Sequence, residues 1–194
     1  MRVLVTGGVG FIGSHIVREL LCAGDDVLVV DDLSTGKQIN LPSGANFVNM
    51  SINDEGLKSV FKEFEPDAVS HCAAQSSVGV SMRDPMLDAQ INILGGMNVL
   101  SATIEAKCPR FLYLNTGGAL YGIPEYLPCD ENHPVMPVSG YGLSKWILEQ
   151  YIGLLSPKSV SCGVFGLVLV SCCCCFASVS FSQQCVRRQG RWCL

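Results

Sequence analysis

Tyr141 and Lys145 stand four residues apart, in the segment Tyr141-Gly142-Leu143-Ser144-Lys145. On a helix, two residues at this spacing lie on one face. A free tyrosine has a pKa of about 10 and is a poor base at neutral pH. A lysine ammonium one turn away favours the phenolate. The pair could therefore remove a proton from a hydroxyl group, although the same spacing also occurs on ordinary exposed helix faces.

A second candidate site is the glycine-rich segment 6–13, in which Gly7, Gly10 and Gly13 are each three residues apart. It follows an apolar run and precedes a helical pattern. Glycines let the backbone turn tightly and approach a pyrophosphate, and the free N–H groups at a helix start attract the anion. The spacing predicts a dinucleotide-binding turn. The alternative is an ordinary turn between a strand and a helix.

An acidic residue favours the dinucleotide interpretation. Asp31 ends the next apolar run, 18 residues after Gly13, where a carboxylate accepts hydrogen bonds from the adenosine ribose hydroxyls. Because a carboxylate at this place repels a 2′-phosphate, the sequence favours NAD over NADP. The alternative is that Asp31 is a solvated turn residue beside Asp32.

The elements that would position these residues alternate along the first part of the chain. Short β-branched runs predict strands, and the stretches between them predict helices, which is the order of a parallel α/β sheet. We therefore expect a Rossmann-like, doubly wound parallel sheet. The expected strands are 2–6, 26–31, 46–50, 67–72 and 110–114, the expected helices are 11–22, 54–64, 85–107 and 140–155, and a loop is expected at 122–137.

Several separated motifs together resemble the extended short-chain dehydrogenase/reductase family, which contains the nucleotide-sugar epimerases and dehydratases. The similarity spans residues 2–158. It rests on the glycine segment, Asp31-Asp32-Leu33-Ser34-Thr35-Gly36, His71-Cys72-Ala73-Ala74-Gln75-Ser76-Ser77-Val78, Ser81 with Asp84-Pro85, Asn92, residues 116–122, and a spaced proline pattern that ends in the Tyr141–Lys145 motif. The resemblance implies NAD as cofactor and a UDP-sugar as substrate, with transient oxidation at carbon 4 that interconverts UDP-glucose and UDP-galactose.

The resemblance also implies roles for single residues. Tyr141 would act as the base, with Lys145 beside it, and Thr116 would hydrogen-bond the reacting sugar oxygen. The implied cofactor-binding residues are Gly7, Gly10, Phe11, Ile12, Gly13, Asp31, Ser34, Ile52, Ala73, Ala74, Gln75, Asn92, Tyr141 and Lys145. Ser51 departs from the family, which often has Asp there to read the adenine amino group.

The loop after Thr116 separates members of this family. Those that act as 4,6-dehydratases carry an Asp-Glu pair after the threonine, and UDP-glucuronate decarboxylases usually carry a Glu, whereas this chain has Gly117-Gly118. Without a carboxylate pair, the loop offers no acid and base for eliminating water. Epimerisation, which needs only one hydride to leave and return, is therefore favoured. A dehydratase or decarboxylase relative and a non-catalytic NAD-binding module remain alternatives.

The sequence changes character at Pro157. Seven of the 11 cysteines lie in the last 36 residues, and residues 160–181 include no charged side chain. We expect an NAD-binding domain over 1–158 and an aberrant Cys-rich tail over 159–194, with the family's substrate domain missing because of a frameshift, a retained intron or a truncated gene. Such a chain would bind NAD weakly and show no epimerase turnover. Alternatively, residues 164–170 fill the place of a sixth strand.

Composition bears on partners and location. The net charge of −4 argues against nucleic acid, since phosphate binding needs an excess of Lys and Arg. No signal-peptide pattern opens the chain, so we expect a cytoplasmic protein. Residues 160–181 are long enough to span a membrane, but their Ser and Cys content makes a membrane anchor a weak alternative. The four scattered cysteines lack zinc-site spacing, so no metal is expected. The family resemblance implies a homodimer through helices 85–107 and 140–155.

Overall fold

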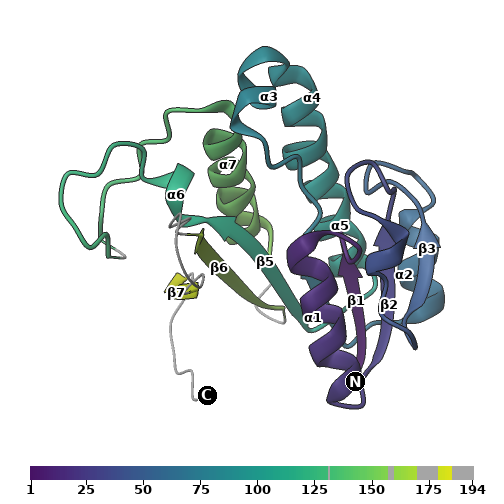
Figure 1. The fold of residues 1–194 in the computed structure, drawn as a ribbon. Helices are drawn as coiled ribbons and strands as arrows, with labels where there is room; N and C mark the ends of the chain where they lie inside the picture. The colour runs from purple at the N-terminus through teal and green to yellow at the C-terminus, as the bar shows by residue number, and fades with distance from the viewer. Residues whose placement is uncertain (131, 157–159, 170–178, 185–194) are drawn as a thin grey trace.

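The computed structural model describes residues 1–130, 132–156, 160–169 and 179–184. The strands among these residues form one sheet, in the order β3-β2-β1-β4-β5-β6-β7 (Figure 1). Every pair in the sheet is parallel except β6 with β7. The chain runs outward from β1 to β3, returns, and continues from β4 on the other side of β1. The predicted Rossmann-like, doubly wound parallel sheet is confirmed.

The strands follow the apolar, β-branched runs of the sequence. Their bounds are β1 (Arg2–Thr6), β2 (Asp26–Asp31), β3 (Asn46–Asn49), β4 (Ala68–His71), β5 (Arg110–Thr116), β6 (Ser161–Leu169) and β7 (Val179–Gln184). The first five match the predicted strands to within two residues. Strand β5 continues to Thr116, which therefore ends a strand instead of lying in a loop.

Two further strands lie in the region expected to be an aberrant tail. Strand β6 runs parallel to β5, with Arg110 opposite Ser161 and Thr116 opposite Leu167, and β7 is antiparallel to β6. The alternative of a sixth strand near residues 164–170 matches this arrangement, although the strand begins earlier and residue 170 lies outside the described residues. The domain division at residue 158 remains a prediction.

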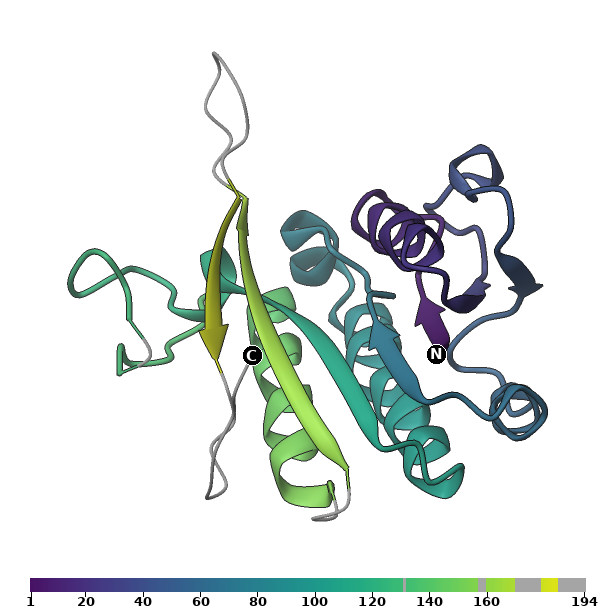
Figure 2. The same cartoon turned by 90° about the horizontal axis from the view of Figure 1, so that it is seen from below.

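The helices occupy both faces of the sheet. Their bounds are α1 (Phe11–Cys22), η1 (Gln38–Asn40), α2 (Leu57–Phe64), α3 (Val78–Arg83), α4 (Pro85–Ala89), η2 (Gln90–Gly95), α5 (Gly96–Glu105), α6 (Gly117–Leu120) and α7 (Gly140–Leu155). Helix α1 packs its Val17 with the valines of β1 and β2 on one face, while α2, α5 and α7 form the larger apolar core on the other (Figure 2).

Three helix predictions need correction. Helix α2 begins at Leu57 instead of residue 54, because the Asp54 carboxylate accepts the Gly56 N–H at 2.7 Å and forms a turn there. The helix expected at 85–107 is divided into α4, the π-helical turn η2 and α5, and it ends at Glu105. The short helices α3 and α6 were not predicted, since few residues in each carry a periodic apolar pattern.

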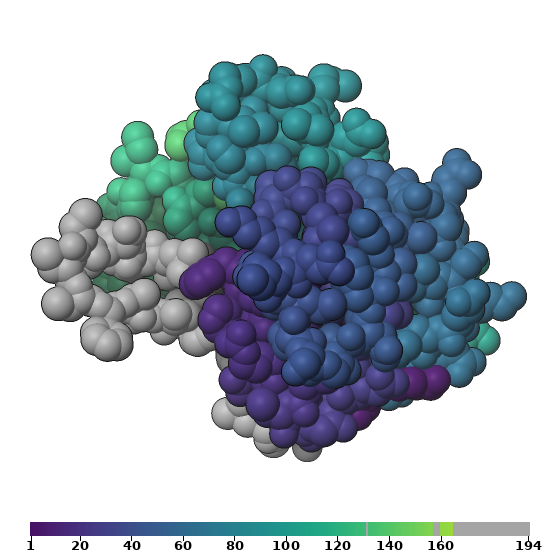
Figure 3. Space-filling view, turned by 45° about the vertical axis from the view of Figure 1, so that its right-hand side comes forward, coloured from purple at the N-terminus to yellow at the C-terminus, as the bar shows by residue number. Residues whose placement is uncertain are grey.

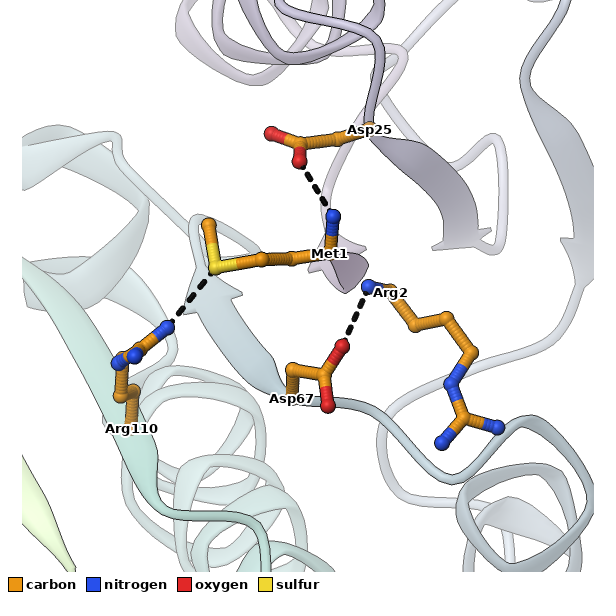
Figure 4. Close-up of polar contacts among 5 residues, drawn as sticks. All are labelled: Met1, Arg2, Asp25, Asp67 and Arg110. Atoms are coloured by element: carbon orange, nitrogen blue, oxygen red, sulfur yellow. Dashed lines mark hydrogen bonds and ion pairs between the residues drawn. The ribbon is translucent and has the colours of Figure 1, made fainter.

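The first two residues of the chain contact neighbouring segments at the edge of the sheet where the strands begin (Figure 4). The Met1 amino group lies 2.6 Å from the Asp25 carboxylate, and the Arg2 N–H donates to Asp67 at 2.8 Å. Arg110, at the start of β5, donates to the Met1 sulfur at 2.8 Å. These contacts join β1 to the starts of β2, β4 and β5. The glycine turn and Thr116 lie at the opposite edge, where the strands end.

Among the helices that the structure describes, none combines the length and apolar character needed to cross a bilayer. The membrane alternative concerned residues 160–181, of which 170–178 lie outside the described residues.

Candidate functional site

The strand order reverses between β1 and β4, and the segments that follow these two strands meet at that point. Gly7 has a φ of +69°, and a Cβ added to it would lie 2.6 Å from the backbone nitrogen of Ala73. No side chain fits there. The glycine turn therefore lies directly against the loop that begins with Ala73 and Ala74. In open α/β sheets, ligands bind at this reversal of strand order.

The other two glycines of the turn differ in what surrounds them. A Cβ on Gly13 would lie 2.1 Å from the Gly7 carbonyl oxygen. Helix α1 therefore packs so closely on the turn that no side chain fits at Gly13. Gly10 is the N-cap of α1 and provides no side-chain cap. The first N–H groups of a helix have no partner within the helix. The N–H groups of Phe11 and Ile12 in this first turn are therefore suited to an anion.

Asp31 lies at the end of β2, beside the glycine turn. Its carboxylate accepts N–H groups from Val9 at 3.2 Å and from Leu33 at 2.9 Å, and the residue is 8% exposed. The backbone thus orients the Asp31 carboxylate, and the remaining lone pairs of its oxygens are able to accept hydrogen bonds from hydroxyl groups. Ser34 follows in a bend, where its N–H donates to Asp32 at 2.9 Å.

A groove of about 610 Å³ lies next to this turn, between the outer face of α1 and residues 35–42. Figure 3 shows this face of the molecule, with α1 in purple and the following segment in blue. Gly10, Phe11 and Thr35 are among the residues that line the groove, and Phe11 is 73% exposed.

Two of the predicted cofactor residues hold each other. The Asn92 side chain accepts the Gln75 N–H at 2.9 Å and donates to the Gln75 carbonyl at 2.9 Å. The Gln75 side chain donates to the Ser77 carbonyl at 3.0 Å and to the Asp88 carboxylate at 2.8 Å. Both amide groups therefore bond to the protein itself, and they shape the loop after β4.

The side chain of Ile52 lies in the hydrophobic core and is 6% exposed. A Cβ added to Gly95 would lie 2.7 Å from its Cδ1 atom, so η2 packs directly on it. The Ile52 carbonyl accepts the Asn98 amide at 2.8 Å. The predicted cofactor residue Ile52 is thus placed as a packing residue, and any contact that it makes with a ligand would come from its backbone.

Tyr141 lies in the first turn of α7, which packs against β5. The N-cap Ser139 fixes this turn, because its hydroxyl accepts the Gly142 N–H at 3.1 Å. The Thr116 side chain, at the end of β5, lies close enough to Tyr141 to act on its phenol as a hydrogen-bonding neighbour. The structure thus places the predicted base beside the predicted sugar-binding hydroxyl.

The pKa of Tyr141 is raised above its ordinary value, mainly because the phenol is buried. The hydrogen bond with Thr116 lowers the pKa, and the negative charge of Asp88 raises it. The sequence led us to expect that Lys145 would favour the phenolate. Burial, which opposes the phenolate, has the largest effect on this pKa and outweighs the favourable effect of Thr116, so the part that Lys145 plays remains a prediction.

Lys145 lies on the same face of α7 but is directed at β5. Its Nζ donates to the Leu114 carbonyl at 2.7 Å and sits 4.4 Å from the centre of the Tyr113 ring. The residue is 4% exposed. Burial lowers the pKa of Lys145 to about 8, while the Cys72 and Asp88 side chains act in the opposite direction. A lysine with this pKa is still mainly charged at pH 7.

Asp88 is a buried residue of the site that was not among the predicted site residues. Its carboxylate accepts the Ser144 hydroxyl at 2.6 Å and the Asn92 amide at 2.9 Å. One signal could have found it. Asp88 and Asn92 are four residues apart, the spacing at which two polar side chains share a helix face. Nothing in that spacing identifies Ser144 as the partner on another helix.

His71, the first residue of the motif at 71–78, is a second buried polar residue of the site. Its Nδ1 lies 2.7 Å from the Thr6 hydroxyl, which also accepts the Ala73 N–H at 3.3 Å. Burial first, and then the charge of Lys145, lower the pKa of His71 to about 3. A neutral imidazole therefore links the ends of β1 and β4 beneath the glycine turn. The described residues include no cluster of His, Cys, Asp or Glu that could hold a metal ion.

Known proteins are similar to this chain in sequence and in fold. The UDP-glucose 4-epimerase of Mycolicibacterium smegmatis is 40% identical over 159 residues, which cover 79% of this chain and 51% of that protein. The solved UDP-glucose 4-epimerase of Thermotoga maritima, with UDP-glucose, has a TM-score of 0.82 and 40% identity, over 84% of this chain and 54% of that one. The Thermus thermophilus UDP-glucose 4-epimerase in complex with NAD has a TM-score of 0.79 and 46% identity, over 84% and 53%.

These matches cover only part of each relative. The chain spans about half the length of the curated relatives that it matches. The family model of the NAD dependent epimerase/dehydratase family matches residues 3–170, which is most of the chain and includes β6. This chain belongs to the NAD dependent epimerase/dehydratase family.

Proposed function

We propose that this chain is the NAD-binding part of a nucleotide-sugar 4-epimerase that interconverts UDP-glucose and UDP-galactose. One observation carries the proposal. The Tyr141 side chain lies beside that of Thr116 at the end of β5, and Lys145 lies one helical turn further along α7. This group of residues lies at the edge of the sheet where the strands end, as the glycine turn does.

The residues at the reversal of strand order fit NAD. A Cβ on Gly7 or Gly13 would collide with backbone atoms, so the turn is a cradle that stays open only with glycine, and the start of α1 faces a pyrophosphate placed in it. Asp31 offers an oriented carboxylate to the adenosine ribose. When bound by these residues, NAD would supply a reversible hydride acceptor for carbon 4 of the sugar. The Thermus thermophilus relative in complex with NAD supports this assignment.

The roles that we propose for these residues are those that the family resemblance implies, and the positions of Tyr141 and Thr116 support them. The Tyr141 oxygen removes the proton from the sugar 4-hydroxyl, and Thr116 hydrogen-bonds the same sugar oxygen. Burial raises the pKa of Tyr141 and so makes the phenol a weaker acid. We expect its pKa to fall when the positive charge of a nicotinamide ring lies beside it. Lys145, charged below about pH 8, adds a second positive charge.

The residues after Thr116 favour epimerisation over elimination of water. Gly117 and Gly118 open α6, and a Cβ on Gly118 would meet nothing within 4 Å. Space for a carboxylate is present there, but this sequence does not supply one. A dehydratase-like activity is therefore less well supported than epimerisation. A non-catalytic NAD-binding module is the competing proposal, and it predicts NAD binding without any effect of Tyr141.

Turnover of UDP-galactose tests the assignment in a full-length relative that carries this same loop. We expect replacement of the tyrosine that corresponds to Tyr141 with Phe to lower kcat by about 10²–10⁴-fold, the usual contribution of a positioned base. Replacement of the residue that corresponds to Gly118 with Ala is the matched control. Activity that persists in the Tyr→Phe variant would disprove the role of Tyr141.

Calorimetric titration of residues 1–194 tests the part present here. We expect weak NAD binding, no epimerase turnover and no tight binding of UDP. The reason is that the relatives are about twice as long as the part that this chain matches. Tight UDP binding would contradict this expectation.

We also propose that the chain forms a homodimer through helices 85–107 and 140–155. Apolar side chains on these helices are exposed, including Met86 at 78%, Leu94 at 60% and Leu154 at 68%. Leu94→Glu should shift the mass measured by light scattering from dimer to monomer. Ile39→Glu is the control, since Ile39 is 89% exposed on η1. An unaltered chain that is monomeric at high concentration would refute the dimer.

A further inference from the structure

We propose that Asp88 is the positioning residue of this site, because its carboxylate joins the helix that carries Tyr141 and Lys145 to the loop after β4. The inference rests on the proposed function, since it concerns how the proposed base is placed against the proposed cofactor loop. Asp88 itself touches neither substrate nor cofactor in this proposal.

Each oxygen of the Asp88 carboxylate has its own partners. Oδ2 accepts the Ser144 hydroxyl at 2.6 Å. Oδ1 accepts the Gln75 amide at 2.8 Å and the Asn92 amide at 2.9 Å. The donors come from α7, from the loop after β4 and from η2. One carboxylate therefore joins its own helical segment to the loop after β4 and to α7, whose Ser144 is 56 residues away in the sequence.

Asp88 is buried, so its carboxylate depends on these hydrogen bonds in place of water. The residue is 1% exposed, and the ion pairs found among the described residues do not include it. A buried carboxylate is costly unless donors satisfy it. Three donors converge here on a group that only accepts. Loss of the carboxylate would leave all three donors without their acceptor.

The consequence for the site follows from where the donors lie. Ser144 is the residue directly before Lys145 and lies three residues after Tyr141, so holding its hydroxyl fixes the rotation of α7 about its own axis. Asn92 also clamps the backbone of Gln75 through two bonds. Asp88 thereby sets the distance between the phenol on α7 and the loop that faces the glycine turn.

Asp88 also acts through its charge. Its carboxylate raises the pKa of both Tyr141 and Lys145. This effect separates a positioning role from a merely structural one. A residue that only stabilises the fold would change the unfolding free energy and leave the titration of Tyr141 where it was.

The variants divide these two effects. Asp88→Asn keeps the shape and the acceptor for Gln75 and Asn92, and the Ser144 hydroxyl turns to accept from the new amide. Asp88→Ala removes both the charge and the acceptor. The matched control is Asp84→Ala on the same helix, because the Asp84 carboxylate caps α4 by accepting the Leu87 N–H at 3.0 Å. Asp84→Ala should lower stability only.

Two measurements on residues 1–194 decide the matter. Tyrosine ionisation is followed by absorbance at 295 nm, at pH values where circular dichroism shows a folded chain, and the Tyr141 signal is identified by subtracting a Tyr141→Phe variant. Affinity for NAD is measured by calorimetry. We expect Asp88→Asn to lower the pKa of Tyr141, and Asp88→Ala to weaken NAD binding by about tenfold or more. Asp88→Asn should recover most of that affinity.

The possible results all bear on the proposal. If Asp88→Asn leaves the Tyr141 titration unchanged, or if Asp88→Ala binds NAD as the unaltered chain does, the proposal is overturned. If Asp88→Ala does not fold, Asp88→Asn and Ser144→Ala still provide the titration and the affinity. If the unaltered chain binds no NAD at all, the proposed function fails, while the Tyr141 titration alone still decides on Asp88.

Discussion

The side chains of Tyr141 and Thr116 lie beside each other where the first turn of α7 meets the end of β5. Thr116, as a hydrogen-bonding neighbour, opposes two effects that raise the pKa of Tyr141, namely burial and the charge of Asp88. Thr116 is therefore the neighbour through which the ionisation of Tyr141 can be adjusted without changing α7 itself.

Replacing Thr116 with Val removes this hydroxyl and keeps the β-branched shape of the side chain. We expect the pKa of Tyr141 to rise further, because a favourable hydrogen bond to the phenolate is lost. Absorbance at 295 nm, with Tyr141→Phe subtracted, measures the change. Thr116→Ser keeps the hydroxyl and should titrate like the unaltered chain. An unchanged titration in Thr116→Val would show that the bond does not act on Tyr141.

The glycines of the site should differ sharply in their tolerance of a side chain. Gly13→Ala places a Cβ 2.1 Å from the Gly7 carbonyl oxygen, and we expect it to lower the free energy of unfolding by about 3 kcal/mol. Gly118→Ala meets nothing within 4 Å and should change that energy by no more than about 1 kcal/mol. Urea unfolding of the two variants gives the comparison. Equal stabilities would mean that α1 does not pack on the turn as described.

Stability should fall with acid through His71. Its pKa is about 3 in the folded chain, against 6.5 for an unperturbed histidine, so between these values the unfolded chain binds the extra proton. The free energy of unfolding should therefore fall by about 1.4 kcal/mol per pH unit below pH 6.5. Urea unfolding from pH 7 to pH 4.5 measures this slope, and His71→Gln should remove it. A slope that survives in His71→Gln would assign the acid sensitivity to other groups.

Lys145 should lower the stability of the chain while it remains charged. Burial lowers its pKa from 10.5 to about 8, which corresponds to about 3 kcal/mol against the ammonium form. Lys145→Met should be more stable than the unaltered chain at pH 7 by about 1–3 kcal/mol. The sign follows from linkage, since the unaltered chain gains stability as the pH rises from 8 towards 10.5.

Urea unfolding at pH 7 and at pH 10 checks this expectation, because the advantage of Lys145→Met should shrink at the higher pH. The same variant should bind NAD more weakly, as expected for a residue that serves the site at the expense of the fold. A variant that is less stable than the unaltered chain at both pH values would contradict the expectation.

The local elements could be predicted because their causes are local. Helix α7 begins where Ser139 caps it and ends near Leu155, as its spacing predicted. The strands β1 and β2 lie where apolar, β-branched runs end in a glycine turn and in Asp31. The same residues carry the family pattern, because the glycines, the acid and the Tyr141–Lys145 spacing each have a mechanical purpose in that fold. The proposed roles of these residues remain predictions.

The sequence by itself thus determined the first five strands, the positions of α1 and α7, the family, and a short set of candidate residues. Only the tertiary structure decided how those residues are used. It directed Lys145 to the Leu114 carbonyl, committed the Asn92 amide to the loop of Gln75, and joined Asp88 to Ser144 across 56 residues of sequence. It also raised the pKa of Tyr141 through burial. The physical reason is that burial and hydrogen bonds between distant segments depend on strand order and helix packing, which no local pattern of residues encodes.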